Sequence, residues 1–134
     1  MFLRNLKLFS IGMTGYSLIE ILWRGRTHWT MSLLGGGCFV TLYQFYKRHT
    51  AMKLINKCLC GSFIITTAEL LCGLIVNCKL KMRVWDYTNM KFNWRGQICA
   101  TYSLLWGLLC IPVSKLCGFI FKREKELTDA TKIS

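Results

Sequence analysis

The chain has 134 residues, of which 53% are hydrophobic, and its mean hydropathy is +0.35. A soluble domain of this size has too little interior to bury so much apolar surface, whereas a protein in a bilayer can leave it outside. The net charge is +12. Because the basic residues lie between long apolar runs, they favour contact with anionic lipid headgroups and argue against a nucleic-acid-binding protein.

Four apolar segments predict an all-α integral membrane protein, a single domain (1–134) with four transmembrane helices arranged as two hairpins. The predicted helices cover residues 8–23, 29–46, 58–77 and 98–121, and the polar tail, residues 122–134, is expected to fray. A helix that crosses a bilayer needs roughly 17–25 residues, so the first is short. Two hairpins in sequence put the first and third connections on the same membrane face.

The distribution of Lys and Arg predicts the orientation of the chain in a cell membrane. The N-terminus, the second connection and the tail hold ten basic residues, against seven in the first and third connections. Because basic residues are enriched in cytoplasmic segments, we expect a multi-pass protein with both termini in the cytoplasm. The bias is small, so a dual topology stays open.

Stripes of small residues predict close packing between helices. The stripes recur every three or four residues, which places each on one helix face, and small side chains let backbones approach closely within a membrane. They consist of Ser103, Gly107, Cys110, Ser114 and Gly118 in the fourth helix, and Ser62, Thr66, Glu69, Gly73 and Asn77 in the third. Three consecutive glycines, residues 35–37, indicate either a break in the second helix or, the favoured interpretation, a close crossing.

Two acidic residues inside apolar runs, Glu20 and Glu69, are the main functional signal. A carboxylate within a transmembrane helix is costly unless it is paired or protonated. It therefore belongs either to a binding site for a cation, a proton or a polar substrate group, or to a structural ion pair. Arg24, four residues after Glu20, lies on the same helix face and can pair with it. The candidate partners of Glu69 are Arg26, Arg83 and Arg95.

The connection between the third and fourth helices, residues 78–97, alternates aromatic and polar side chains. Trp and Tyr favour the depth of lipid headgroups, which explains Trp85 and Tyr87 as part of an interfacial belt. A belt does not explain Asp86 or Asn93. An Asp at this place can cap a turn; alternatively, the loop folds over the helices as a lid or a ligand-facing rim.

Motifs for metal binding, cofactor binding and catalysis are weak. His28 is a candidate to complete a metal site with the carboxylates, but no ligand spacing supports one. The eight cysteines form no C-x-x-C pair, which favours packing within apolar runs over metal binding or disulfides. Neither a Ser-His-Asp arrangement nor a phosphate loop nor a dinucleotide fingerprint is recognisable, so no cofactor and no metal is predicted.

Motifs in the second half of the chain resemble the type IV ABC-transporter family of small membrane proteins. They are Trp85-Asp86-Tyr87-Thr88, Asn93, Gly96-Gln97-Ile98-Cys99, Tyr102-Ser103 and Trp106. Weaker matches upstream are Glu69 with Gly73, and Gly15-Tyr16 with Glu20, so the resemblance spans about residues 11–121. It implies a role connected with transport. Because the chain has no Walker motif, ATP hydrolysis would require a partner subunit.

These patterns together predict a small transporter or channel-type protein with a polar site within the membrane. The predicted substrate- or ion-binding residues are Glu20, Arg24, His28, Glu69, Trp85, Asp86, Tyr87 and Asn93. The expected partners are the lipid bilayer, a second copy of the chain in a homodimer, and a partner membrane or ATPase subunit. Two alternatives stay open: a membrane enzyme that acts on a lipid or other interfacial substrate with carboxylates as acid and base, and a regulatory or assembly partner without a substrate.

Overall fold

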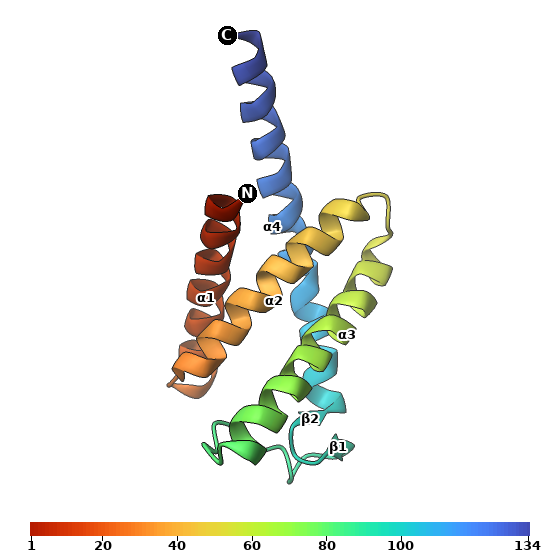
Figure 1. Ribbon diagram of the computed structural model, residues 1–134. Helices are drawn as coiled ribbons and strands as arrows, with labels where there is room; N and C mark the ends of the chain where they lie inside the picture. The colour runs from red at the N-terminus through yellow and green to blue at the C-terminus, as the bar shows by residue number, and fades with distance from the viewer.

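The computed structural model describes residues 1–134, which are helical apart from loops and one very short hairpin (Figure 1). Helices α1 (Phe2–Arg24) and α2 (Trp29–Arg48) are followed by α3 (Leu54–Gly73), which continues into a π-helical turn over Leu74–Lys79. Strands β1 (Asn93–Trp94) and β2 (Ile98–Cys99) pair antiparallel, and α4 (Ala100–Ile133) ends the chain. The prediction of an all-α chain with four helices is therefore confirmed.

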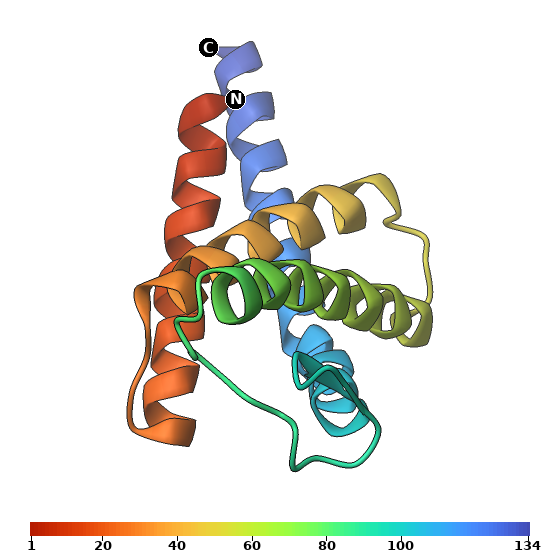
Figure 2. The same ribbon diagram turned by 60° about the horizontal axis from the view of Figure 1, so that its bottom comes forward.

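The helices form two antiparallel pairs. α1 packs along α2, and α3 packs along α4, while α2 also contacts both α3 and α4. Figures 1 and 2 show α2 lying between α1 and the α3–α4 pair. Both termini lie toward one end of the bundle, and the α1–α2 turn and the loop before α4 lie at the other (Figure 1). The first and third connections therefore share one end of the molecule, as two hairpins predict.

Glycines allow α1 and α2 to cross closely. A Cβ atom on Gly35 would lie 2.5 Å from Cβ of Tyr16, and a Cβ atom on Gly12 would lie 2.5 Å from Cβ of Phe39. Carbon atoms in contact normally stay about 3.5–4.0 Å apart, so a larger residue at either glycine would push the backbones apart. α2 runs without interruption through its three glycines, and Gly35 and Gly36 lie against Tyr16 and Phe9 of α1, so these two mark a close crossing and not a break; a Cβ atom on Gly37 would meet nothing within 4 Å.

The small-residue stripes of α3 and α4 face each other. The Ser62 hydroxyl donates a hydrogen bond to the Ser103 carbonyl at 2.6 Å, and the hydroxyls of Thr66 and Ser103 lie 2.9 Å apart. On the same side of α3, Gly61 lies against Cys110 of α4. Short side chains on both faces thus let the two backbones approach closely, as the sequence predicts, except at Gly118, where a Cβ atom would meet nothing within 4 Å.

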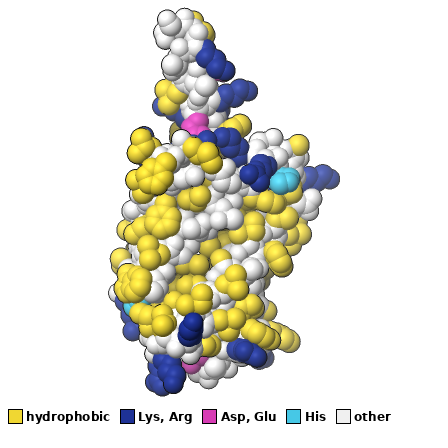
Figure 3. Space-filling model, in the orientation of Figure 1, with side chains coloured by type: hydrophobic (Ala, Val, Ile, Leu, Met, Phe, Trp, Pro, Cys, Tyr) yellow, Lys and Arg dark blue, Asp and Glu magenta, His cyan; other side chains and the backbone are white.

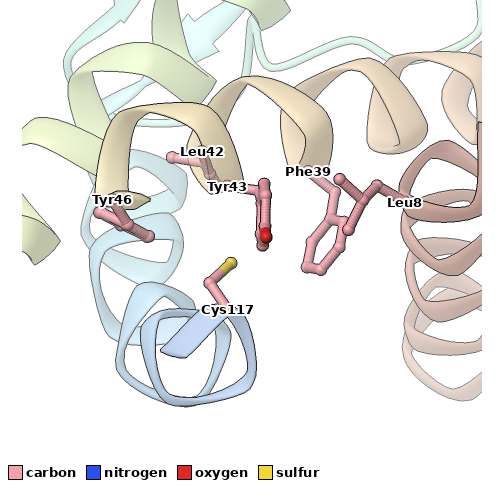
Figure 4. Packing of buried hydrophobic residues seen from close by; sticks show 6 residues of the cluster. All are labelled: Leu8, Phe39, Leu42, Tyr43, Tyr46 and Cys117. Atoms are coloured by element: carbon pink, nitrogen blue, oxygen red, sulfur yellow. The ribbon is translucent and has the colours of Figure 1, made fainter. Parts of the chain in front are cut away.

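Buried hydrophobic side chains form two clusters. The first joins α1, α2 and α4 and is shown in Figure 4; it consists of Leu8, Phe39, Leu42, Tyr43, Tyr46 and Cys117. The second lies where the loop before α4 meets the helices, and it consists of Met31, Val76, Val84, Trp85, Tyr87 and Cys99. This second cluster holds the loop against α2 and α3 and so positions the candidate site.

Much of the outer surface is apolar. Only 24 of the 134 residues are buried, and large hydrophobic side chains such as Leu22, Phe63 and Leu104 are exposed. Figure 3 shows hydrophobic side chains across the middle of the visible face, with Lys and Arg gathered toward its two ends. An apolar band between charged ends is the distribution that a bilayer favours.

Two helical stretches are long and apolar enough to cross a membrane: Leu54–Lys79 and Ala100–Ile133. This finding rests on length and composition, and it supports association with a membrane. α1 and α2 do not meet this criterion. The expectation of four transmembrane helices is therefore supported for α3 and α4 alone.

The C-terminal segment differs from the expectation of a frayed tail over residues 122–134, because α4 continues through Ile133. The Tyr43 hydroxyl donates to the Glu124 carboxylate at 2.5 Å, which ties this part of α4 to α2. Arg123 lies 3.9 Å from Glu126, one turn along, and Lys and Glu favour helices intrinsically. At the other terminus, α1 begins at Phe2 and not at residue 8.

Candidate functional site

Glu69 of α3 is the most deeply buried charged residue in the chain, with 2% of its surface exposed. The Tyr87 hydroxyl donates a hydrogen bond to Oε1 at 2.7 Å, and the indole Nε1 of Trp106 donates to Oε2 at 3.0 Å. One donor comes from the loop and the other from α4, so the carboxylate joins three parts of the fold. Two hydrogen bonds offset part of the cost of burying it.

No basic side chain pairs with Glu69. The two ion pairs in the structure join Glu20 to Arg24 and Arg123 to Glu126. The expectation that Arg26, Arg83 or Arg95 pairs with Glu69 is therefore wrong. All three lie in connections at the end of the bundle, whereas Glu69 lies inside it, one helical turn before Gly73.

The loop is held over Glu69 by contacts with the end of α3. The indole Nε1 of Trp85 donates to the Gln97 carbonyl at 2.9 Å, and the Asn77 amide donates to Oε1 of Gln97 at 2.9 Å. Gly73 makes room for this packing, because a Cβ there would lie 2.5 Å from Oε1 of Gln97. The loop therefore rests directly on α3 and delivers Tyr87 to the carboxylate.

Asp86 and Asn93 shape the loop. Asp86 Oδ1 accepts a hydrogen bond from the Thr88 amide at 2.9 Å, which is the turn cap that the sequence allows. The Asn93 side chain donates to the Met90 carbonyl at 2.8 Å and accepts from the Gly96 amide at 3.1 Å. Neither side chain reaches Glu69, so the structure separates these two predicted site residues from the carboxylates.

Burial changes the chemistry of Tyr87, which is 7% exposed. Removal from water raises the pKa of its hydroxyl above the ordinary value of 10.0, and the nearby Glu69 carboxylate raises the pKa further. The hydroxyl therefore stays protonated at physiological pH and remains a hydrogen-bond donor to Glu69.

Glu20 of α1 forms a second buried carboxylate, with 4% of its surface exposed. The Tyr16 hydroxyl donates to Oε1 at 2.9 Å, and Nε of Arg24 lies 3.3 Å from Oε2. The predicted pairing of Glu20 with Arg24 is thus present. The pair lies within ion-pair distance but without hydrogen-bond alignment, so Oε2 has no hydrogen-bond donor. Arg24 also reaches the loop, where Nη2 donates to the Val84 carbonyl at 3.4 Å.

A series of aromatic rings lies between the two carboxylates. The rings of Tyr87 and Tyr102 stack with centroids 4.7 Å apart, and the Tyr102 ring lies 6.0 Å from that of Trp106. The Trp106 ring lies 6.2 Å from that of Tyr16, which donates to Glu20. The rings thus connect the donors to Glu69 with the donor to Glu20.

Two adjoining cavities open beside these rings. The larger has a volume of about 310 Å³ and is lined by all four helices, and Glu69 is the one charged residue in its wall. The smaller, of about 170 Å³, is lined by α1, α4 and Tyr87, and includes Glu20 and Arg24. The two share Tyr16, Ile19, Trp106 and Leu109. Both are otherwise mainly apolar, as ligand sites generally are.

His28 lies outside both cavities. It precedes the first residue of α2, where Nδ1 accepts a hydrogen bond from the Thr30 amide at 3.3 Å, and its ring stacks on that of Trp29. It therefore caps the helix. No three His, Cys, Asp or Glu side chains come close enough together to hold a metal ion.

Three aromatic residues were not among the predicted site residues: Tyr16, Tyr102 and Trp106. Spacing offers a signal for each, because Tyr16 lies four residues before Glu20, and Tyr102 lies four before Trp106. Residues four apart share a helix face.

Comparison with known proteins finds a family whose model covers the residues of this site. A family model described as "Putative ABC-transporter type IV" matches residues 7–132, which includes both carboxylates, the loop and the aromatic rings. No curated protein and no solved structure is significantly similar to this chain. Because the family model covers nearly the whole sequence, the chain belongs to the type IV ABC-transporter family.

Proposed function

We propose that this chain is the membrane-embedded part of a small transporter and that it binds a cationic group of its substrate at Glu69. The observation that carries the proposal is a buried carboxylate without a cationic partner in the wall of a cavity. A carboxylate in a membrane interior needs a counter-charge or a proton, because hydrogen bonds alone offset only part of its desolvation. A bound cation supplies that charge.

The proposed function also includes a topology for the four helices in the membrane, a homodimer and a partner subunit. All four helices cross the bilayer as two hairpins, with both termini in the cytoplasm and the loop over Glu69 on the outer face. The apolar outer surface supports this arrangement. Two copies form a homodimer, because a single chain encloses only small cavities. Since the chain has no Walker motif, any energy from ATP comes through a partner ATPase subunit.

A comparison of two Glu→Gln variants tests the role of Glu69. Glu69→Gln keeps the size of the side chain and removes its charge, and it leaves no arginine unpaired because none pairs with Glu69. Glu126→Gln is the matched control, since that side chain is 54% exposed on α4. Loss of a charge-assisted hydrogen bond costs at most about 1–3 kcal/mol, so both variants should fold.

The assay is uptake of radiolabelled tetramethylammonium and methylammonium into proteoliposomes under an inside-negative potential, which drives cations without an ATPase. Wild type and Glu126→Gln should accumulate at least one of these cations, and Glu69→Gln should not. Equal uptake by a folded Glu69→Gln variant would refute the role of the carboxylate. Absence of uptake by the wild type for both cations would refute the proposed function.

A further inference from the structure

We infer that the ligand of this site is a single-chain amphiphile with an alkylated ammonium headgroup, whose chain lies in the larger cavity while the headgroup lies at Glu69. This inference rests on the proposed function and adds the class of substrate. It follows from the opening of the cavity, its size, and the chemistry of its wall.

The cavity opens between α1 and α4. α2 contacts α1, α3 and α4, and α3 contacts α4, but α1 and α4 do not pack extensively on each other. In Figure 4, the side chains of Phe39 and Tyr43 extend from α2 between α1 and α4, where they belong to a buried cluster, and Phe39 also lines the cavity. The cavity is lined by Ile11, Gly15 and Ile19 of α1 and by Leu109 and Val113 of α4, among others. In a membrane this opening faces the lipid, so an apolar chain can enter sideways without crossing water.

The size of the cavity suits one alkyl chain. Its volume is about 310 Å³. An apolar cavity of roughly 150 Å³ holds a benzene molecule, with six carbon atoms, so this one holds about twelve. The second chain of a two-chain lipid would have to stay outside, in the bilayer.

The polar end of the cavity selects a cation. Glu69 supplies the one charge in the wall, and it is negative. Trp106 and Tyr16 present rings beside it, and the faces of such rings attract cations. An alkylated ammonium matches this setting, because it has few or no N–H groups to satisfy and its charge is spread over carbon atoms that pack on aromatic rings.

Gly15 offers a way to block the chain without disturbing the fold. It lines the cavity, and a Cβ atom placed there would meet nothing within 4 Å. Gly15→Leu should therefore fill part of the cavity and leave the α1–α2 crossing intact. Gly118→Leu is the matched control, because a Cβ there also meets nothing within 4 Å and Gly118 lines neither cavity.

The test measures saturable binding of radiolabelled dodecyltrimethylammonium to the full chain in phosphatidylglycerol nanodiscs, with empty discs as background. Wild type and Gly118→Leu should bind it, while Gly15→Leu and Glu69→Gln should bind at least tenfold more weakly. Unlabelled dodecyl sulfate should not compete. A series of chain lengths in the wild type should show affinity that rises to about twelve carbons and then levels off; this arm does not depend on any variant.

Discs that contain phosphatidylcholine distinguish the source of the headgroup. Unchanged binding of the probe in these discs supports a single-chain amphiphile, whereas weaker binding would assign the site to a two-chain bilayer lipid and would overturn the inference. Equal binding by wild type and Gly15→Leu, or competition by dodecyl sulfate, would overturn the inference. If tetramethylammonium is still taken up through Glu69 in that case, the proposed function stands; if it is not, both fail.

Discussion

The packing of α3 on α4 makes a sharp prediction about two glycines in the same interface. A Cβ atom on Gly61 would collide with Sγ of Cys110 and would lie 2.5 Å from the Tyr46 hydroxyl oxygen. A Cβ atom on Gly107 would lie 3.6 Å from Cβ of Ser62, which is an ordinary contact. Gly61→Ala should therefore destabilise the chain, and Gly107→Ala should not.

The two variants share one contribution to the free energy of unfolding and differ in another, and the second sets the size of the expected difference. Both replace a helical glycine by alanine, so both gain up to about 1 kcal/mol of helix propensity. Only Gly61→Ala adds an atom where none fits, and overpacking of this kind costs typically ~1–3 kcal/mol. Tyr46 cannot move away freely, because its hydroxyl donates to the Lys57 carbonyl at 3.0 Å and its side chain is buried. We expect Gly61→Ala to be less stable than Gly107→Ala by about 1–3 kcal/mol.

Equilibrium unfolding in mixed micelles, followed by circular dichroism, measures the difference. A double-mutant comparison sharpens it: Gly61→Ala should cost less stability in a background of Cys110→Ala with Tyr46→Phe, which lacks both colliding atoms, than in the wild type. Equal stability of the two single variants would refute the close approach of α3 and α4 at this point. Gly107→Leu, which adds a large side chain, should destabilise the chain in either case.

Three further predictions address the site and the topology. Arg24→Leu leaves the buried Glu20 carboxylate without its cation and should lower thermal stability more than the double variant Arg24→Leu with Glu20→Gln; the reverse order in melting experiments would contradict the pairing. Because burial raises the pKa of Tyr87 above 10.0, the folded state holds that proton more tightly than the unfolded state. The resulting stabilisation is complete below pH 10 and is lost as the pH rises further, so Tyr87→Phe should show less loss of stability above pH 10 than the wild type; identical pH profiles would exclude this contribution. A single cysteine at position 130, in a cysteine-free chain in cells, should react with thiol reagents only after the membrane is permeabilised; labelling in intact cells would place the C-terminus outside.

The sequence by itself determined the number and type of the main elements. Long apolar runs separated by basic connections specify helices whatever their neighbours are, and the helical period places small residues on one face. That is why close packing at the small-residue faces of α3 and α4, and a close crossing at the glycines of α2, were predictable, although the partner of each face was not. The two carboxylates were identified for a similar reason, because a charge inside an apolar run must be compensated wherever it lies.

Only the tertiary structure decided how each carboxylate is satisfied. Glu20 has a partner four residues away, so its ion pair with Arg24 was visible in the sequence. The donors to Glu69 come from residues 18 and 37 positions further along the chain, Tyr87 and Trp106. No local spacing encodes such contacts, because they depend on how the loop folds back on Gly73 and how α4 packs on α3. The cavity that Glu69 lines has the same origin, since it exists only where four helices leave a space between them.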